Sequence, residues 1–231
     1  MLSPDSELVR HYDCRYYRAG HGGYQPDEGY FRLLGRYWRR RIFEDLGRDP
    51  EAPILDFGAG LGLVTSACPR VVCVEPSEYA MMRLKELGRP VFRNLQELRG
   101  SWPGRFRYIL LHHVLEHLFR PSDTLLQLHS VIERDGELLI VVPFEKQAHR
   151  PVRLPDTNRH LYCWTFQTLY NLLDACGWRP QYQGLLLNPC GLRFFRTILR
   201  LSEDAAVRWA ARIGSITRRR KAIFFIARSV Q

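Results

Sequence analysis

Short runs of apolar residues alternate with longer amphipathic stretches along most of the chain. The apolar runs predict seven strands, at Pro53–Phe57, Val71–Val74, Pro90–Phe92, Arg107–Leu111, Glu137–Val142, Arg179–Leu187 and Ala222–Ala227. Helical periodicity falls between most of them, including Pro121–Ile132 and Thr165–Cys176, and Gly136 and Gly177 are expected where a helix passes into a strand. This alternation predicts an α/β fold, with a mostly parallel seven-stranded sheet and helices on both faces.

The two ends of the chain depart from this alternation. Residues 1–30 are rich in tyrosine, glycine and charge and are expected to form a cap, and Phe31–Leu46 has a helical period. A helix-rich excursion separates the last two predicted strands, which suggests a C-terminal antiparallel hairpin with an insertion. We expect one domain over residues 1–231, with a cap or lid and helix at 1–46, a sheet core at 50–187 and a helical insertion at 189–221.

Composition is that of a globular protein. The chain has 231 residues, of which 45% are hydrophobic, enough for one α/β domain with a substantial core. We find no signal peptide and no apolar run of about 18 residues, and therefore expect a cytoplasmic protein without a transmembrane segment. The six cysteines form no Cys-x-x-Cys pair, which indicates reduced thiols and argues against a zinc site built on them.

The charge balance is basic, with 34 lysines and arginines against 24 acidic residues and a formal net charge of +10. Such a balance attracts anions, including phosphorylated metabolites, nucleic acid and acidic membrane surfaces. An arginine-rich genome would give the same composition without any binding role. Both explanations stay open at this point.

A glycine turn follows the first predicted strand, in the segment Ile54–Gly62. Glycines are needed where the backbone turns sharply and a ligand approaches it closely, and we expect a helix to follow. The dinucleotide pattern Gly-x-Gly-x-x-Gly fails because its last position is Leu63. Asp56, directly before the glycines, would repel a pyrophosphate but suits a ligand that carries an ammonium group.

A second acid, Glu75, ends the next predicted strand. A glutamate at that place can accept hydrogen bonds from both hydroxyls of a ribose. Asp56 and Glu75 together therefore predict an adenosyl ligand with a zwitterionic tail. The alternative is a strand, turn and helix with two incidental acids.

These segments resemble the first two motifs of class I S-adenosylmethionine-dependent methyltransferases. The resemblance continues in order through Tyr108–Leu118, Ile132–Pro143 and Arg159–Leu161 and covers about residues 50–187. It implies a Rossmann-like fold and S-adenosylmethionine as cofactor, with Asn94 near the adenine and His112 beside the methionine portion. The cofactor-binding residues that it implies are Asp56, Phe57, Gly58, Ala59, Gly60, Glu75, Pro76, Asn94 and His112.

The acceptor side of the expected cleft carries His113, Glu116 and His117. Their spacing of i, i+3 and i+4 places them on one face in a helical conformation, at the carboxyl end of the fourth predicted strand. His160, on a later loop, could converge on them. In one interpretation His117 or His113 is the general base for a hydroxyl acceptor, since the pKa of histidine lies near neutrality. In another, Glu116 and His117 only hold the loop by hydrogen bonds.

A third interpretation is a divalent metal on His113, Glu116, His117 and His160. This pattern is similar to the Glu-x-x-Glu-His and downstream His of small-RNA 3′-terminal 2′-O-methyltransferases, with His113 in place of the first Glu. The replacement changes the set of ligands, and we expect no metal. We name His117 and His113 as the catalytic residues.

Two further segments are candidates for substrate binding. Four tyrosines of the N-terminal arm could fold over the cofactor as a lid: Tyr12, Tyr16, Tyr17 and Tyr24. Arg196 and Arg200, on the insertion, could hold an anionic acceptor, or the insertion could rest on acidic lipid or only pack on the core. The substrate-binding residues that we expect are Tyr17, Tyr24, His160, Arg196 and Arg200.

We expect an S-adenosylmethionine-dependent O-methyltransferase that acts on a polar or anionic small-molecule biosynthetic intermediate, such as a sugar, a carrier-linked or an aromatic compound. Nucleic acid is a less favoured partner, because we recognise no RNA-binding module. The alternatives are an RNA 2′-O-methyltransferase with a His/Glu metal site and a non-catalytic, cofactor-binding partner subunit.

Overall fold

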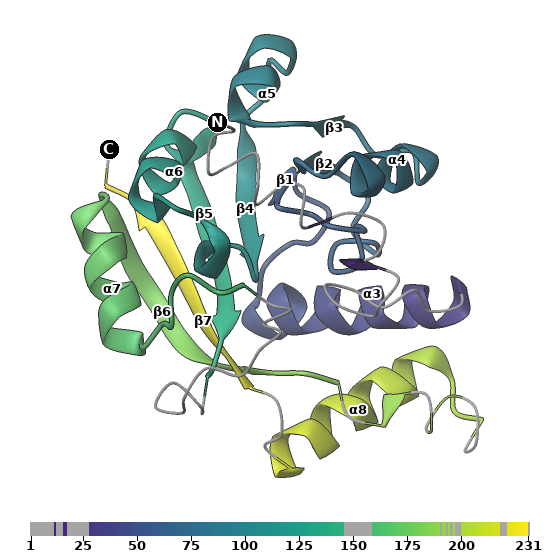
Figure 1. Ribbon diagram of the computed structural model, residues 1–231. Helices are drawn as coiled ribbons and strands as arrows, with labels where there is room; N and C mark the ends of the chain where they lie inside the picture. The colour runs from purple at the N-terminus through teal and green to yellow at the C-terminus, as the bar shows by residue number, and fades with distance from the viewer. Residues whose placement is uncertain are drawn as a thin grey trace.

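The computed structural model describes residues 12, 16–17, 28–145, 159–189, 191–192, 194, 196, 200–217 and 221–230 (Figure 1). Its seven strands are β1 (Ile54–Phe57), β2 (Val71–Val74), β3 (Val91–Phe92), β4 (Phe106–His112), β5 (Ile132–Pro143), β6 (Trp178–Leu187) and β7 (Lys221–Ser229). The sheet order is β3-β2-β1-β4-β5-β7-β6. Strands β1 to β5 pair in parallel, and β7 runs antiparallel to both β5 and β6. The predicted mostly parallel sheet with a C-terminal antiparallel hairpin is confirmed.

Helices cover both faces of the sheet, as predicted. The α-helices are α3 (Glu28–Ile42), α4 (Glu78–Glu86), α5 (Leu95–Ser101), α6 (Pro121–Leu128), α7 (Phe166–Ala175) and α8 (Glu203–Thr217). Two short 3₁₀ turns are η1 (Glu44–Leu46) and η2 (Leu115–His117). Alternate residues along a strand point to opposite faces, so Leu55 and Ile109 pack with α5, α6 and α7, whereas Ile54 and Leu110 pack with α3 and α8. No helix of the described residues is long and apolar enough to cross a bilayer.

The helix that we expected after the glycine turn is absent, and the segment between Gly62 and β2 consists of turns. The segment is short, and its hydroxyl groups bond locally: Thr65 donates to Asp56 and Ser66 donates to the carbonyl of Leu63. Such bonds compete with a helical backbone. Helix α3 lies against this segment, where a Cβ on Gly35 would lie 1.9 Å from the Ser66 hydroxyl. The absence of a side chain on Gly35 therefore allows α3 to approach the segment.

The expected boundary between helix α6 and strand β5 was also wrong. Helix α6 ends at Leu128, β5 already begins at Ile132, and Gly136 lies inside the strand. The register with β4 shifts here, because Phe106 pairs with Ile132 while Tyr108 pairs with Glu137. Gly136 sits in this irregular segment, where a Cβ would lie 3.0 Å from the carbonyl oxygen of Phe106. Gly177, by contrast, has φ +75° between α7 and β6, as expected.

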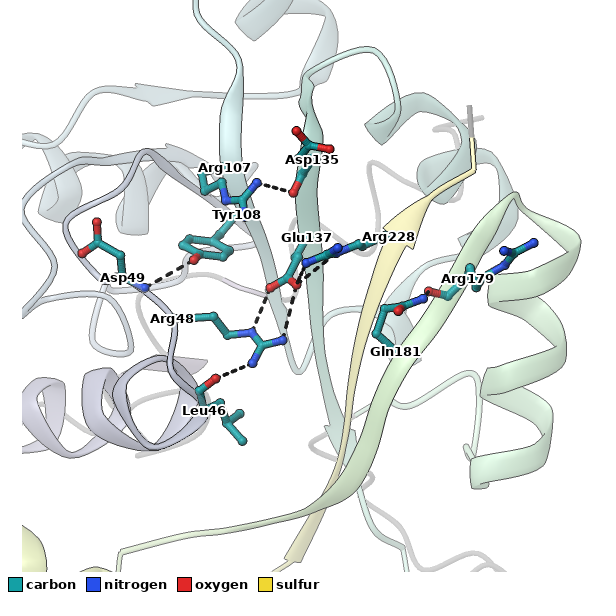
Figure 2. Close-up of polar contacts among 10 residues, drawn as sticks. All are labelled: Leu46, Arg48, Asp49, Arg107, Tyr108, Asp135, Glu137, Arg179, Gln181 and Arg228. Carbon is teal, nitrogen blue, oxygen red and sulfur yellow. Dashed lines mark hydrogen bonds and ion pairs between the residues drawn. The ribbon is translucent and has the colours of Figure 1, made fainter.

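Directly after this irregularity, the buried Glu137 joins three parts of the chain (Figure 2). Its carboxylate accepts hydrogen bonds from Arg48, which follows η1, at 2.8 Å and from Arg228, on β7, at 3.1 Å. A buried carboxylate is stable when it is paired and hydrogen-bonded. Glu137 therefore holds β5 and β7 together near the end of β7.

Candidate functional site

A cleft of about 1010 Å³ opens where β1, β2, β4 and β5 end. Ligands bind in open α/β sheets at this edge, outside the carboxyl ends of the parallel strands. The lining includes every residue that we expected to bind cofactor: Asp56, Phe57, Gly58, Ala59, Gly60, Glu75, Pro76, Asn94 and His112. It also includes His113, His117, His160 and the arm residues Tyr12, Tyr16 and Tyr17.

The glycine turn forms the floor of the cleft between β1 and β2. Gly58, Gly60 and Gly62 have φ of +73°, +53° and +74°, which side chains rarely tolerate. The amide of Gly58 donates to the carbonyl of Val74 at 2.7 Å. A Cβ on Gly58 would lie 2.6 Å from the side chain of Val114, so the loop also approaches the segment after β4 closely.

Glu75 is buried at the end of β2 and closes this loop. Its two carboxylate oxygens accept from the backbone amides of Gly60 and Ser77, each at 2.8 Å. Burial raises the pKa of Glu75 to about 7, although the two amides act in the opposite direction. The glycine loop is thus attached to the strand that carries the acid.

Asp56 is the second buried acid of the cleft. Thr65 donates a hydrogen bond of 2.6 Å to its carboxylate. Burial raises the pKa of Asp56 to about 6, against the lowering effect of the Thr65 hydroxyl and of the nearby Arg89. Asp56 and Glu75 therefore place two carboxyl groups on one side of the cleft, which we call the cofactor half. A ligand with hydroxyl or ammonium donors would stabilise both carboxyl groups in their charged form.

Asn94 lies beyond β3, at the far end of the cofactor half. Its side-chain oxygen accepts from the amide of Glu97 at 2.9 Å and caps helix α5. Asn94 therefore has a structural role here, whether or not it also contacts a ligand.

His112 ends β4 on the opposite wall. Its ring lies 5.0 Å from the ring of Trp38, on α3, in an edge-to-face arrangement. Its Nε2 atom is buried without a hydrogen-bond partner among the described residues. Burial lowers the pKa of His112 well below the ordinary range, so this ring is neutral at physiological pH.

His113 and Glu116 meet, but not on a helix as we expected. His113 has φ +57°, a left-handed conformation that is unusual without glycine, and only Leu115–His117 form a single 3₁₀ turn. The Nδ1 atom of His113 lies 3.2 Å from the carboxylate of Glu116, which is fully buried. The other carboxylate oxygen of Glu116 has no partner among the described residues.

His117 and His160 complete this cluster. The Nδ1 atom of His117 hydrogen-bonds to the Tyr12 hydroxyl at 2.8 Å, and its ring also bonds to the backbone of Arg159. Burial lowers the pKa of His117. The ring of His160 lies 4.9 Å from that of His117, and its Nδ1 atom contacts the carboxylate of Glu145.

Three residues of this cluster could bind a metal ion. Glu116, His117 and His160 offer ligand atoms that lie within 4.8 Å of one another. Two histidines and one carboxylate form a chemically competent set for a divalent cation. The expectation that no metal is used stays a prediction.

The tyrosines of the arm lie over the cofactor half. Tyr17 is buried and stacks on Tyr79 with ring centres 5.7 Å apart, next to Leu61 of the glycine turn. The carbonyl of Tyr12 accepts from the Ser77 hydroxyl at 2.6 Å. Burial raises the pKa of Tyr12, Tyr16 and Tyr17, so these phenols are neutral.

Two of the expected substrate-binding residues, Arg196 and Arg200, are not part of this arrangement, and the prediction for a third is not tested. Tyr24 lies outside the described residues. Arg196 and Arg200 are exposed, and neither lines the cleft. The guanidinium of Arg196 instead donates to the carbonyl of Leu201 at 3.1 Å.

Further residues of the site were not predicted from the sequence, among them Trp38, Thr65, Ser77 and Glu145. The first three gave no signal beyond helical periodicity or an ordinary hydroxyl. Glu145 did give one, because it is an acid just after a predicted strand, like Asp56 and Glu75.

A family model described as a methyltransferase domain matches residues 30–183, about two thirds of the chain. The chain therefore belongs to this methyltransferase family and is an S-adenosylmethionine-dependent methyltransferase. The matched range contains most of the residues that line the cleft. The described lining residues outside it are Tyr12, Tyr16, Tyr17, Asn188 and Ala222.

Solved structures share the fold at low sequence identity. The 1,6-didemethyltoxoflavin-N1-methyltransferase of Burkholderia thailandensis, with bound S-adenosylhomocysteine, has a TM-score of 0.61 at 19% identity, over 100% of this chain and 92% of that one. The magnesium protoporphyrin IX methyltransferase of Synechocystis, with bound S-adenosylmethionine, has a TM-score of 0.58 at 14% identity, over 99% of both chains. The plantazolicin methyltransferase, in complex with S-adenosylhomocysteine, has a TM-score of 0.55 at 16% identity, over 98% of this chain and 91% of that one. No curated protein sequence matches the chain.

Proposed function

We propose that the cleft binds S-adenosylmethionine between the two buried acids, with Glu75 on the ribose hydroxyls and Asp56 near the ammonium group. The residues fit such a group because each acid has a raised pKa that hydroxyl and ammonium donors would lower. The buried, unpartnered Nε2 atom of His112 gives the methionine portion a further polar partner. When bound, the cofactor supplies an electrophilic methyl group on a sulfonium.

We propose that His113 is the general base that removes a proton from an acceptor hydroxyl. The observation that carries this assignment is its contact with Glu116. A buried carboxylate at 3.2 Å favours the tautomer with the proton on Nδ1, which leaves Nε2 as the atom that accepts the proton. The left-handed backbone of His113 supports the assignment, because strain of this kind persists where surrounding structure and function require it.

His117, the other catalytic candidate, is less available. Its Nδ1 atom is engaged by Tyr12, and its ring also bonds to the backbone of Arg159. We infer that His117 positions the arm over the cleft, and that the arm excludes water from the transferring methyl group.

The acceptor that this arrangement supports is a polar small molecule with a hydroxyl group, such as a sugar, a carrier-linked or an aromatic intermediate. The supporting features are a proton acceptor on the cleft wall and aromatic rings near it, including Trp38 and Phe144. Among the described lining residues Arg93 is the single arginine, and it lies beside Asn94 at the cofactor half.

The test uses His113→Gly, because glycine adopts a positive φ without strain. We expect this variant to fold and to bind S-adenosylmethionine equally well. We also expect it to transfer tritiated methyl from the cofactor to a panel of phenols and sugars at least about 100-fold more slowly, as general-base catalysis typically contributes. Undiminished transfer by a folded variant would exclude His113 as the base.

A further inference from the structure

Helix α8 presents a basic and aromatic face away from the rest of the molecule. Its opposite face is buried through Ala206, Val207 and Ala210. Trp209, in contrast, is 47% exposed, and the guanidinium of Arg212 lies 5.8 Å from the centre of its ring. Arg208 is exposed as well and lies one helical turn before Arg212. We call Arg208, Trp209 and Arg212 the outer face of α8.

The acids of α8 do not neutralise this face. Glu203 accepts from Arg32 at 2.9 Å and from Arg36 at 2.6 Å, and Asp204 lies 3.5 Å from Arg36, so both acids are occupied by helix α3. No carboxylate of the described residues lies within ion-pair distance of Arg208.

The segment before α8, of which residues 191–192, 194, 196 and 200–202 are described, also exposes aromatic and basic side chains. Phe194 is 50% exposed, and Arg196 and Arg200 are exposed without an ion-pair partner among the described residues. Leu192, at the start of this segment, is buried in the same apolar cluster as Ala206 of α8. The segment and the helix are therefore anchored in a common core, and both leave aromatic and basic groups exposed.

The position of the insertion relates this surface to the cleft. Asn188, which follows β6, and Ala222, the second residue of β7, both line the cleft. Helix α8 lies on the outer side of α3, at the end of the sheet toward which β4 and β5 point (Figure 1). A surface bound to the outer face of α8 would therefore lie at the same end of the sheet as the cleft.

We propose that the outer face of α8, with Phe194, Arg196 and Arg200, docks on the surface of an anionic phospholipid bilayer. Arginines attract acidic headgroups, and an exposed indole beside them inserts at the boundary between headgroups and acyl chains. Trp209 on α8 and Phe194 on the segment before it are exposed on the surface rather than set in a groove. This arrangement suits a flat lipid surface better than a nucleic-acid strand. The proposal is independent of the base assigned to methyl transfer.

The experiment is flotation of the full chain with vesicles of phosphatidylcholine alone or mixed with phosphatidylglycerol. We expect binding only to the anionic vesicles. The double variant Arg208→Ala/Arg212→Ala should bind them at least about tenfold more weakly. A matched control, Arg99→Ala/Arg120→Ala, removes the same charge from exposed positions elsewhere and should bind like the wild type. Calorimetry with S-adenosylmethionine verifies that each variant is folded.

A second readout is specific to the indole. Lipids brominated on their acyl chains should quench tryptophan fluorescence of the wild type, and Trp209→Phe should lose most of this quenching. Equal binding to neutral vesicles, no binding to either kind, or an equal loss in the control variant would overturn the proposal. So would an RNA oligonucleotide that binds the same arginines more tightly and displaces the vesicles.

Discussion

Replacement of Glu75 by glutamine should change how the stability of the protein depends on pH. Burial raises the pKa of Glu75 from its ordinary value near 4.3 to about 7. The folded protein therefore binds a proton at this carboxyl more tightly than the unfolded chain does. Stability from this group is fully present at acid pH and falls as the pH rises from about 4 through 7, after which it stays level.

The magnitude follows from the same shift. One pKa unit corresponds to about 1.4 kcal/mol, so ionisation of Glu75 in the apo protein costs about 4 kcal/mol of unfolding free energy well above pH 7. Glutamine keeps the shape and does not titrate. The difference in stability between the wild type and Glu75→Gln should therefore shift by about 2.5 kcal/mol in favour of the variant between pH 5 and pH 8, because about 1 kcal/mol has already been lost at pH 5. Asp56 titrates in both proteins, so its contribution largely cancels in the difference.

Urea denaturation of both apo proteins at four pH values between 5 and 8 measures this difference. In the presence of S-adenosylmethionine the wild type should instead be more stable than Glu75→Gln. A charged carboxylate that accepts from the ribose hydroxyls is worth about 1.5–3 kcal/mol, so the variant should bind the cofactor roughly 10- to 150-fold more weakly at pH 8. Identical pH slopes would refute the raised pKa. Equal cofactor affinity would refute the ribose contact, and NAD should bind neither protein.

Three further outcomes are expected. Gly58→Ala should lose about 2 kcal/mol of unfolding free energy in urea, because its Cβ would lie 2.6 Å from Val114. The control Gly47→Ala has a similar φ of +67° and nothing within 4 Å of the added Cβ, so it should lose only the cost of the backbone conformation, about 1 kcal/mol. Equal losses would show that the contact with Val114 has no cost. Glu137→Ala should lower the unfolding free energy by about 3 kcal/mol because it leaves Arg48 without its buried partner, while Glu44→Ala, which breaks an exposed pair with Arg39, should cost less than about 1 kcal/mol. Methyl transfer by protein purified without a polyhistidine tag should survive exhaustive chelation, and stoichiometric metal in elemental analysis would overturn the assignment of His113 as an unaided base.

The strands and the two acids of the cofactor half could be predicted from the sequence because buried parallel strands are nearly continuous apolar runs. Val71–Val74 was predicted to the residue, and Asp56 and Glu75 follow from their places at strand ends. The turn at Thr65 could not be predicted, because the choice between a helix and local hydroxyl bonds depends on the buried Asp56 beside it.

The acceptor half was harder to predict, because its geometry depends on backbone conformation and on contacts distant in sequence. A positive φ at His113 has no signature when the residue is not glycine. The contact of His117 with Tyr12 spans 105 positions, and periodicity carries no information about it. The spacing of His113 and Glu116 did predict their contact, although the chain reaches it without a helix.

Strand β7 has a consequence for how the protein is made. It is the last of the seven strands in sequence, yet it lies between β5 and β6 and hydrogen-bonds to both. During synthesis, β6 leaves the ribosome with no neighbour to pair with until β7 follows. The sheet can close only once β7 has emerged, so a nascent chain exposes the edge of β5 until then, and loss of β7 would open the middle of the sheet rather than trim its border.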